Sequence, residues 1–382
     1  MRAAWTGARW QIRVTAGAPR RTTREAASGC GRRAACHNRR VPPPWVLCLG
    51  LSGGLLLGVA TGLDRPFPPL GGEAPTPERA ALGRLLFFDP LLSEDGTLSC
   101  AHCHQPGRAF TDGLPVARGR AGQPLARNTP TLWNVAFKQR LMWDRRAASL
   151  EEQARIPLLA ADEMAADPER LVARLAAIPA YREGFASAFP GEPAALTLGN
   201  VTRALAAFER TLVSQSSRYD RYAQGERSAL GPSERRGLAL FRSLNTRCFE
   251  CHRLPTFEAP LALGVGVPSA DPGIAGVSGE PAERGLFGVP TLRNVALTAP
   301  YMHDGSLPTL AAVVDFYRRG GGRGLGVAGD RIDSQVRPFS IRDAEAADLV
   351  AFLGSLSDES GSPENPERVP SGLPVLRMET TP

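Results

Sequence analysis

The chain has 382 residues, with 45 lysines and arginines against 38 aspartates and glutamates. Residues 1–63 hold ten arginines and one acid, Glu25, so the remaining residues carry 35 basic and 37 acidic side chains, a net charge of −2. A nearly neutral folded region argues against nucleic acid as a partner, and the length is sufficient for two domains.

Residues 1–63 are predicted to be a targeting segment with an arginine-rich extension. The extension ends at Arg39-Arg40, and an apolar stretch follows from about residue 45 to 63. Small residues at 60–62 could be cleaved by a signal peptidase. The alternative is an uncleaved membrane anchor, because the apolar stretch is close to the length needed to span a bilayer. Both alternatives predict an exported protein.

The folded region is predicted to consist of helices and loops. Helical spacing marks residues 78–87, 198–212 and 234–241. Ser149-Leu150-Glu151-Glu152 is a capping box, and Asp167-Pro168 places a proline in the first turn of a helix.

A last helix is predicted to begin at Ser340 and to include the apolar residues of 349–356. Residues 253–289 and 320–330 are loops rich in glycine and proline, and no alternating apolar run suggests a sheet. The polar tail, residues 358–382, is predicted to be disordered.

Two pentapeptides carry the attachment signature of a c-type haem. They are Cys100-Ala101-His102-Cys103-His104 and Cys248-Phe249-Glu250-Cys251-His252. In this motif both thiols add to the haem vinyl groups, and the histidine after the second cysteine becomes the proximal iron ligand. The sequence therefore predicts two covalently bound haem c groups.

The other cysteines and histidines agree with this interpretation. Cys30, Cys36 and Cys48 all lie in the targeting segment, so the folded region is predicted to hold no disulfide. A structural zinc site could use the same residue types, but it needs four ligands. Beyond the two motifs and His37, the only histidine is His303, which leaves too few ligands for zinc.

The segments that follow the two motifs match each other. The sequence PTLWNVA at 130–136 is repeated as PTLRNVA at 290–296, and Met142-Trp143-Asp144 corresponds to Met302-His303-Asp304. An internal duplication is predicted. The fold would be mostly α, with two cytochrome c-like haem domains at residues 74–225 and 226–357 and a boundary near residues 225–231.

Over residues 74–357 the sequence resembles the bacterial di-haem cytochrome c peroxidase and MauG family, and more closely its MauG-type branch. The matching motifs are Leu92-Ser93 through His104, the segment 127–131, Trp143-Asp144, Pro157 with Glu163-Met164, and the segment 299–305. The resemblance implies a periplasmic oxidoreductase, a cytochrome-c peroxidase-like di-haem peroxidase that uses hydrogen peroxide as oxidant.

The resemblance makes the N-terminal haem, with His104 below the iron, the peroxide site. Peroxidases of the family close the opposite side of this iron with a second histidine. Arg120 stands at that position here, and no histidine occurs between His104 and His252. The resemblance thus implies an open site, as in the MauG branch, with Met142, Met164 or water as the alternative ligands.

Glu163 matches the glutamate that moves the peroxide proton in this family, and Gln153 and Pro157 match residues that shape the same pocket. Trp143 matches a tryptophan between the two haems that can carry an oxidising equivalent. Without the resemblance, Glu163 would be interpreted as a solvated acid and Trp143 as a core residue. The sequence departs from the family at Arg145, where glycine is usual.

The C-terminal haem, with His252 below the iron, would be the electron-transfer centre. Its second ligand is methionine in the peroxidases and tyrosine in the MauG branch, and the matching position is Tyr317. Met302 is the rival ligand, and a plain core tyrosine is the other alternative, because Tyr317 lies on an apolar helix face. His303 matches a family histidine near the haems that does not bind iron.

A calcium ion between the domains is also implied. The side chain of Asn128 and the backbone carbonyls of Thr298 and Pro300 match its protein ligands, and oxygen ligands suit this hard cation. A homodimer is left open by the sequence.

Electrons would come from a small cytochrome c or a cupredoxin. The alternative is MauG-like oxidation of a protein or organic substrate through high-valent haems. The surface tryptophan of MauG aligns with Thr246, however, so formation of a tryptophan-derived cofactor in another enzyme is not implied. A third hypothesis is a non-catalytic di-haem electron carrier, which needs a second protein ligand on the first haem.

Overall fold

The computed structural model describes residues 65–376, apart from the side chain of Asp330. The predicted targeting segment at 1–63 therefore lies outside the described residues, as does the end of the tail at 377–382. Within 65–376, no helix combines the length and the apolar character that crossing a bilayer requires.

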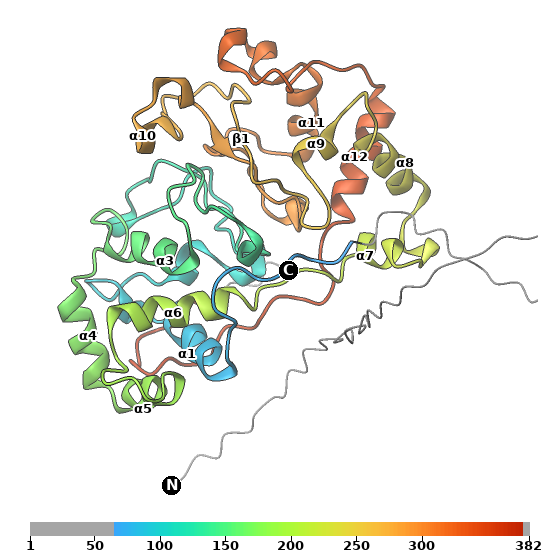
Figure 1. Ribbon diagram of the computed structural model, residues 1–382. Helices are drawn as coiled ribbons and strands as arrows, with labels where there is room; N and C mark the ends of the chain where they lie inside the picture. Colours follow the sequence, from blue (N-terminus) through green and yellow to red (C-terminus); the bar gives the residue numbers. More distant parts are fainter. Residues whose placement is uncertain (1–64, 377–382) are drawn as a thin grey trace, which may run out of the picture. The chain divides into compact units, whose positions relative to one another are not determined.

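The described chain is rich in helix and contains little sheet, in agreement with the prediction of a mostly α fold (Figure 1). The helices are α1 (Pro77–Phe88), α2 (Cys100–Cys103), α3 (Leu150–Leu159), α4 (Pro168–Ala177), α5 (Pro179–Ala188), α6 (Leu198–Glu209), α7 (Arg218–Ala223), α8 (Pro232–Phe241), α9 (Cys248–Cys251), α10 (Ala275–Ser278), α11 (Leu310–Arg318) and α12 (Asp343–Gly354). Strands β1 (Ala262–Leu263) and β2 (Phe287–Gly288) form one antiparallel pair.

Several helices begin at the signals that the sequence contains. The Ser149 hydroxyl accepts a hydrogen bond from the amide of Glu152 at the start of α3, and the Asp167 carboxylate does the same for Arg170 at the start of α4. The last helix begins at Asp343, three residues after the predicted Ser340. Its start is set by Glu345, whose carboxylate accepts from the backbone amide of Arg342.

Two close helix crossings organise the hydrophobic core. In Figure 1, α1 lies against α6 and α8 lies against α12. A methyl group on Gly83 would approach the carbonyl oxygen of Ala204 to 1.8 Å, and one on Gly237 would approach that of Asp348 to 1.9 Å. Glycine is therefore required at both crossings, because any side chain would push the helices apart.

The crossings lie in two separate hydrophobic clusters. The first contains α1, α3, α6 and the first haem motif, and the second contains α8, α12 and the second motif. Tyr219 of α7 belongs to the second cluster. The packing therefore changes from the first cluster to the second before α7, earlier in the chain than the predicted boundary at 225–231.

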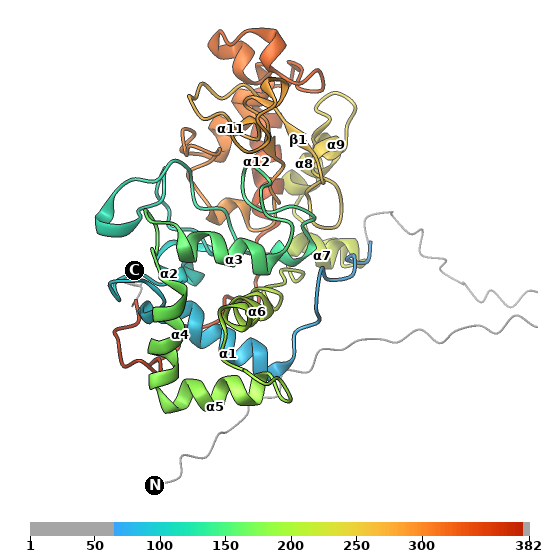
Figure 2. The same cartoon turned by 60° about the vertical axis from the view of Figure 1, so that its left-hand side comes forward.

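The tail differs from its prediction over residues 358–376. After α12 the chain returns to the first cluster (red trace, Figure 2), where the side chain of Val369 is 5% exposed. The Ser371 hydroxyl donates a hydrogen bond of 2.7 Å to the carboxylate of Asp89. The prediction of disorder is wrong for this segment, because one buried valine and a few specific hydrogen bonds outweigh its polar composition.

Candidate functional site

Both haem motifs face one cavity of about 1100 Å³. Residues from each half of the described chain line it, including Cys103 and His104 from the first motif and Cys248, Cys251 and His252 from the second. A smaller cavity of about 70 Å³, next to the first motif, is lined by Cys100 as well. The fold thus gathers both predicted attachment sites around one enclosed space.

The two proximal histidines are held in the same way. Nδ1 of His104 lies 3.0 Å from the carbonyl oxygen of Phe110, and Nδ1 of His252 lies 3.1 Å from that of Phe257. A carbonyl can only accept, so each Nδ1 carries the hydrogen and each Nε2 keeps its lone pair for a metal. Burial lowers the pKa of His104, and it lowers that of His252 to about 4. Both rings are therefore neutral at physiological pH.

None of the four motif cysteines forms a disulfide. Burial raises the pKa of Cys103 to about 12 and that of Cys248 to about 11. Thiols with such values are not nucleophilic thiolates at neutral pH. Each of the four cysteines lines at least one of the two cavities, as attachment points for a haem must.

Glu163, Gln153 and Pro157 lie together on the side of the cavities that α3 forms. Gln153 and Pro157 are four residues apart on this helix and so share a face, while Glu163 follows in the turn after it. All three line both cavities together with His104. Burial raises the pKa of Glu163, the charge of Asp162 adds to this rise, and Arg146 opposes it.

The two methionines considered as alternative ligands of the first iron each line a cavity that His104 also lines, Met142 the larger one and Met164 the smaller one. The Met142 sulfur lies 3.7 Å from the side-chain amide nitrogen of Gln153, which donates to it. Met164 is buried in the first hydrophobic cluster. The Met142 sulfur therefore has a hydrogen-bond donor beside it, and both methionines stay alternatives to an open site.

Trp143 lines the cavity that the two motifs share. Its indole Nε1 donates to the backbone oxygen of Asn128 at 2.9 Å, and its own carbonyl accepts from the amide of Gly288 at 2.8 Å. These bonds fix the ring between a segment of the first half and strand β2.

Arg145, where the sequence departs from the family pattern, has a φ of 60°. Gly305 occupies the corresponding place in the second half with a φ of 63°. The arginine therefore adopts the left-handed conformation that favours glycine, and the turn after Trp143 keeps its form.

Tyr317 and Met302 both line the shared cavity. Burial raises the pKa of Tyr317, and the nearby sulfurs of Cys251 and Cys248 add to the rise. Tyr317 is thus close to the second attachment site, which is where a second iron ligand would have to lie.

His303 is buried, and its ring stacks on Phe287 with the centroids 3.8 Å apart. Its Nε2 has no hydrogen-bond partner among the described residues. Its backbone oxygen accepts from the amide of Asn128 at 2.8 Å. His303 therefore joins the two halves through its main chain.

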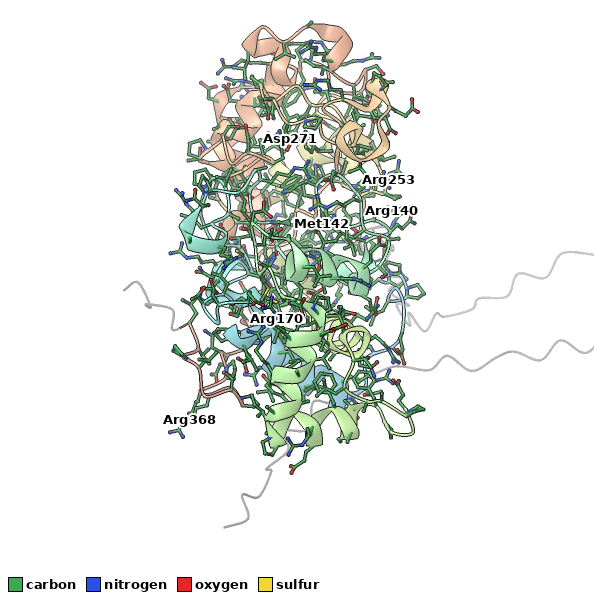
Figure 3. All side chains as sticks on the ribbon, turned by 90° about the vertical axis from the view of Figure 1, so that its left-hand side faces the viewer. Arg140, Met142, Arg170, Arg253, Asp271 and Arg368 are labelled. Carbon is green, nitrogen blue, oxygen red and sulfur yellow. The ribbon has the colours of Figure 1, made fainter. Side chains whose placement is uncertain are left out.

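Sequence reasoning missed an ion-pair cluster beside these residues. Arg127 bonds the carboxylate of Asp144 at 2.5 Å and that of Asp271 at 2.6 and 2.9 Å. Asp271, labelled in Figure 3, comes from the long loop before β2, 144 residues along the chain. No local pattern could have identified this partner, because the pair forms only when the two halves meet.

The three oxygens predicted to bind calcium all belong to residues that line the shared cavity. The side-chain Nδ2 of Asn128 donates to the carbonyl of Leu114 at 2.8 Å, which leaves Oδ1 free. The carbonyls of Thr298 and Pro300 accept no hydrogen bond within residues 65–376. In this range no group of three or more histidine, cysteine or acidic residues could hold a metal, so a cation here would depend on amide and carbonyl oxygens.

The arrangement fits covalently attached haem. Each motif supplies two cysteines on a one-turn helix and a neutral histidine whose Nε2 can bind a metal. Both motifs open onto a cavity with a largely apolar lining, which suits a porphyrin ring.

Known proteins with similar sequences and structures agree. A family model described as di-haem cytochrome c peroxidase matches residues 77–228. The methylamine utilization protein MauG of Methylorubrum extorquens is 41% identical over 287 residues, 74% of this chain and 79% of the relative. The cytochrome c551 peroxidase of Nitrosomonas europaea is 36% identical over 347 residues, 87% of this chain and 97% of the relative. A solved MauG-like protein associated with microbial copper homeostasis has a TM-score of 0.70 at 36% identity, covering 78% of this chain and 95% of that one.

Proposed function

Since the chain belongs to the di-haem cytochrome c peroxidase family, which includes MauG, and is a di-haem peroxidase-like enzyme with haem c cofactors, we propose that it is exported to the periplasm and reduces hydrogen peroxide at its N-terminal haem. The observation that carries this proposal is the position of Glu163. Its side chain lines the same two cavities as His104, and burial raises its pKa.

The bound haem supplies the iron at which the O–O bond of peroxide is reduced. With peroxide in the cavity, Glu163 would take a proton from one peroxide oxygen and return it to the other, which leaves as water. Burial raises the pKa of this carboxyl, so it holds a proton more readily than an exposed glutamate, which suits the return of the proton to the leaving oxygen. Gln153 and Pro157 confine the substrate beside it.

Complete reduction of one peroxide to two waters consumes two electrons and two protons. We infer that the electrons reach the first site from the second through Trp143, which is anchored in both halves and lines the cavity that they share. Tyr317 is the proposed second ligand of the C-terminal haem, with His252 as the first. The proximity of Tyr317 to Cys248 and Cys251 supports this assignment, and Met302, which lines the same cavity, is the rival ligand.

The matched segments after the two motifs support an internal duplication into two cytochrome c-like domains. Asn134 and Asn294 both have a φ of 61°, and Met142 and Met302 have φ values of 70° and 76°. The equivalent glycine crossings of α1 with α6 and α8 with α12 add to this support.

A calcium ion held by Asn128, Thr298 and Pro300 is proposed for the junction of the halves, on the basis of their three unpaired oxygens. The electron donor is proposed to be a small cytochrome c or a cupredoxin. MauG-like oxidation of a protein or organic substrate is the second candidate, and the 41% identity with a MauG protein favours it.

The test is peroxide reduction by the holo-protein, with a reduced small cytochrome c as donor. Glu163→Gln should lower the turnover number at least ~100-fold, as expected for loss of a general acid–base group. Glu169→Gln, which removes an exposed carboxylate on α4, is the matched control and should retain activity. Turnover of Glu163→Gln within threefold of the wild type would contradict the proposal.

A further inference from the structure

The two proximal histidines are supported by loops of the same construction. Each loop is closed by an antiparallel bridge, Gln105 with Thr111 in the first half and Arg253 with Glu258 in the second. Each presents the carbonyl of a phenylalanine to the histidine Nδ1, and both phenylalanines have positive φ values, 60° for Phe110 and 54° for Phe257.

A threonine ties each loop to the segment that follows it. The Thr131 hydroxyl donates to the carbonyl of Ala109 at 2.6 Å, and the Thr291 hydroxyl donates to that of Thr256 at 2.6 Å. Each threonine oxygen also accepts from the backbone amide two residues later, at 3.1 Å in both halves. The histidine and threonine hydrogen bonds of the first loop are therefore all repeated in the second.

The halves differ in the side chain that packs on the phenylalanine. In the first half the Trp133 ring meets Phe110 edge-on, with the centroids 5.4 Å apart. In the second half the guanidinium of Arg293 lies 5.5 Å from the centre of the Phe257 ring. An apolar ring beside one proximal loop is thus replaced by a positive charge beside the other.

Arg293 is 1% exposed, and its hydrogen bonds leave it little freedom. Nε and Nη2 both donate to the carbonyl oxygen of Pro255, at 3.0 and 2.8 Å. Nη1 donates to the carboxylate of Asp220 at 2.6 Å. Asp220 is itself held by Ser217 at the start of α7 and makes no hydrogen bond to the loop. The guanidinium is therefore a buried charge in direct contact with the loop of His252. The loop also contains Glu258, whose carboxylate is paired with Lys138 at 3.0 Å.

Stability alone does not account for this ion pair. Burying two charges costs several kcal/mol, and apolar residues of similar volume often serve equally well. Trp133 shows that the same loop construction accepts an apolar side chain at this position.

We propose that Arg293 is a positioning residue for His252, which holds the Pro255–Phe257 backbone and makes the second haem site electrically different from the first. This inference rests on the proposed function, because it requires His252 to ligate a haem iron. A nearby fixed positive charge disfavours the more positive oxidation state of an iron. Asp220 offsets part of this charge from farther away. The guanidinium should therefore raise the reduction potential of the second haem.

The test uses the full holo-protein and a redox titration in which each haem is followed by its own EPR signal. Arg293→Met combined with Asp220→Asn removes both charges and leaves neither unpaired. Arg293→Lys keeps the charge but cannot donate to Pro255 and Asp220 with the same planar fork. Trp133→Phe is the matched control in the first half. The haem content of the wild-type chain, measured as pyridine haemochrome, tests the proposed function separately, because that function requires two haems per chain.

The double variant should lower the reduction equilibrium constant of the His252 haem at least threefold, about 28 mV at 59 mV per tenfold change. The His104 haem should shift less than twofold. Arg293→Lys should alter the g values of the His252 haem, whereas Trp133→Phe should leave them unchanged. A smaller shift in the double variant, or equal shifts at both haems, would overturn the inference. If the double variant does not fold, unaltered g values in Arg293→Lys would do so.

Discussion

The indole Nε1 of Trp143 donates a hydrogen bond of 2.9 Å to the backbone oxygen of Asn128. The backbone amide of the same asparagine donates a hydrogen bond of 2.8 Å to the carbonyl of His303 in the other half. Its side chain supplies one of the three oxygens proposed to bind calcium. The ring proposed to pass electrons between the haems is thus bonded directly to a proposed cation ligand.

Removal of the Asn128 oxygen should therefore weaken calcium binding. Asn128→Ala is expected to lower the affinity at least tenfold, because two carbonyl oxygens and waters remain as ligands. Calorimetric titration of chelator-treated protein with Ca²⁺ measures this effect. Asn365→Ala, far along the chain in the tail, should leave affinity and stoichiometry unchanged. Equal affinity in Asn128→Ala and the wild type would remove the proposed site.

The pH dependence of peroxide reduction should respond to Asp162. Its negative charge raises the pKa of Glu163 in addition to the larger effect of burial. Asp162→Asn should therefore lower that pKa, and the acid limb of kcat/KM should move to lower pH. A limb that stays in place or moves to higher pH would show that Glu163 does not control it.

Glu209 should make stability depend on pH. It is buried on α6, its Oε2 has no hydrogen-bond partner among the described residues, and burial raises its pKa to about 8. In the unfolded chain this carboxyl has the ordinary pKa of a glutamate, 4.5. The folded state therefore binds more protons between these values, and stability is lost as pH rises through this window, by on the order of 5 kcal/mol.

Glu209→Gln should abolish this loss. Its melting temperature should exceed that of the wild type at pH 8.5 and approach it at pH 5. Calorimetry at both pH values measures the difference, and Glu169→Gln serves as the exposed control. A difference that is the same at both pH values would rule out an ionising Glu209 as the cause.

The tail should contribute to the stability of the first cluster. Val369→Ala removes two buried methyl groups and should cost on the order of 2 kcal/mol of unfolding free energy. Arg368→Ala is the matched control, because this neighbouring side chain is exposed and projects away from the ribbon in Figure 3. Denaturant unfolding of both variants measures the effect. Equal stability of the two variants would mean that the tail does not pack against the first cluster in solution.

Local signals predicted the parts of the structure that depend on a few adjacent residues. The start of α3 at Ser149 and the start of α4 at Asp167-Pro168 are examples. The carbonyls of Phe110 and Phe257, which orient the proximal histidines, could not be predicted in this way, because a backbone oxygen leaves no mark in the sequence. The Arg127–Asp271 pair and the buried Val369 depend on contacts between distant segments.

The most direct test of the account is a low-temperature EPR spectrum of the diferric protein before and after one equivalent of hydrogen peroxide. An open site at His104 predicts a high-spin signal, and ligation by His252 and Tyr317 predicts a low-spin signal beside it. Both should disappear on peroxide addition without prior reduction. Two low-spin signals that peroxide leaves unchanged would contradict the account and indicate an electron carrier or a peroxidase that must first be reduced.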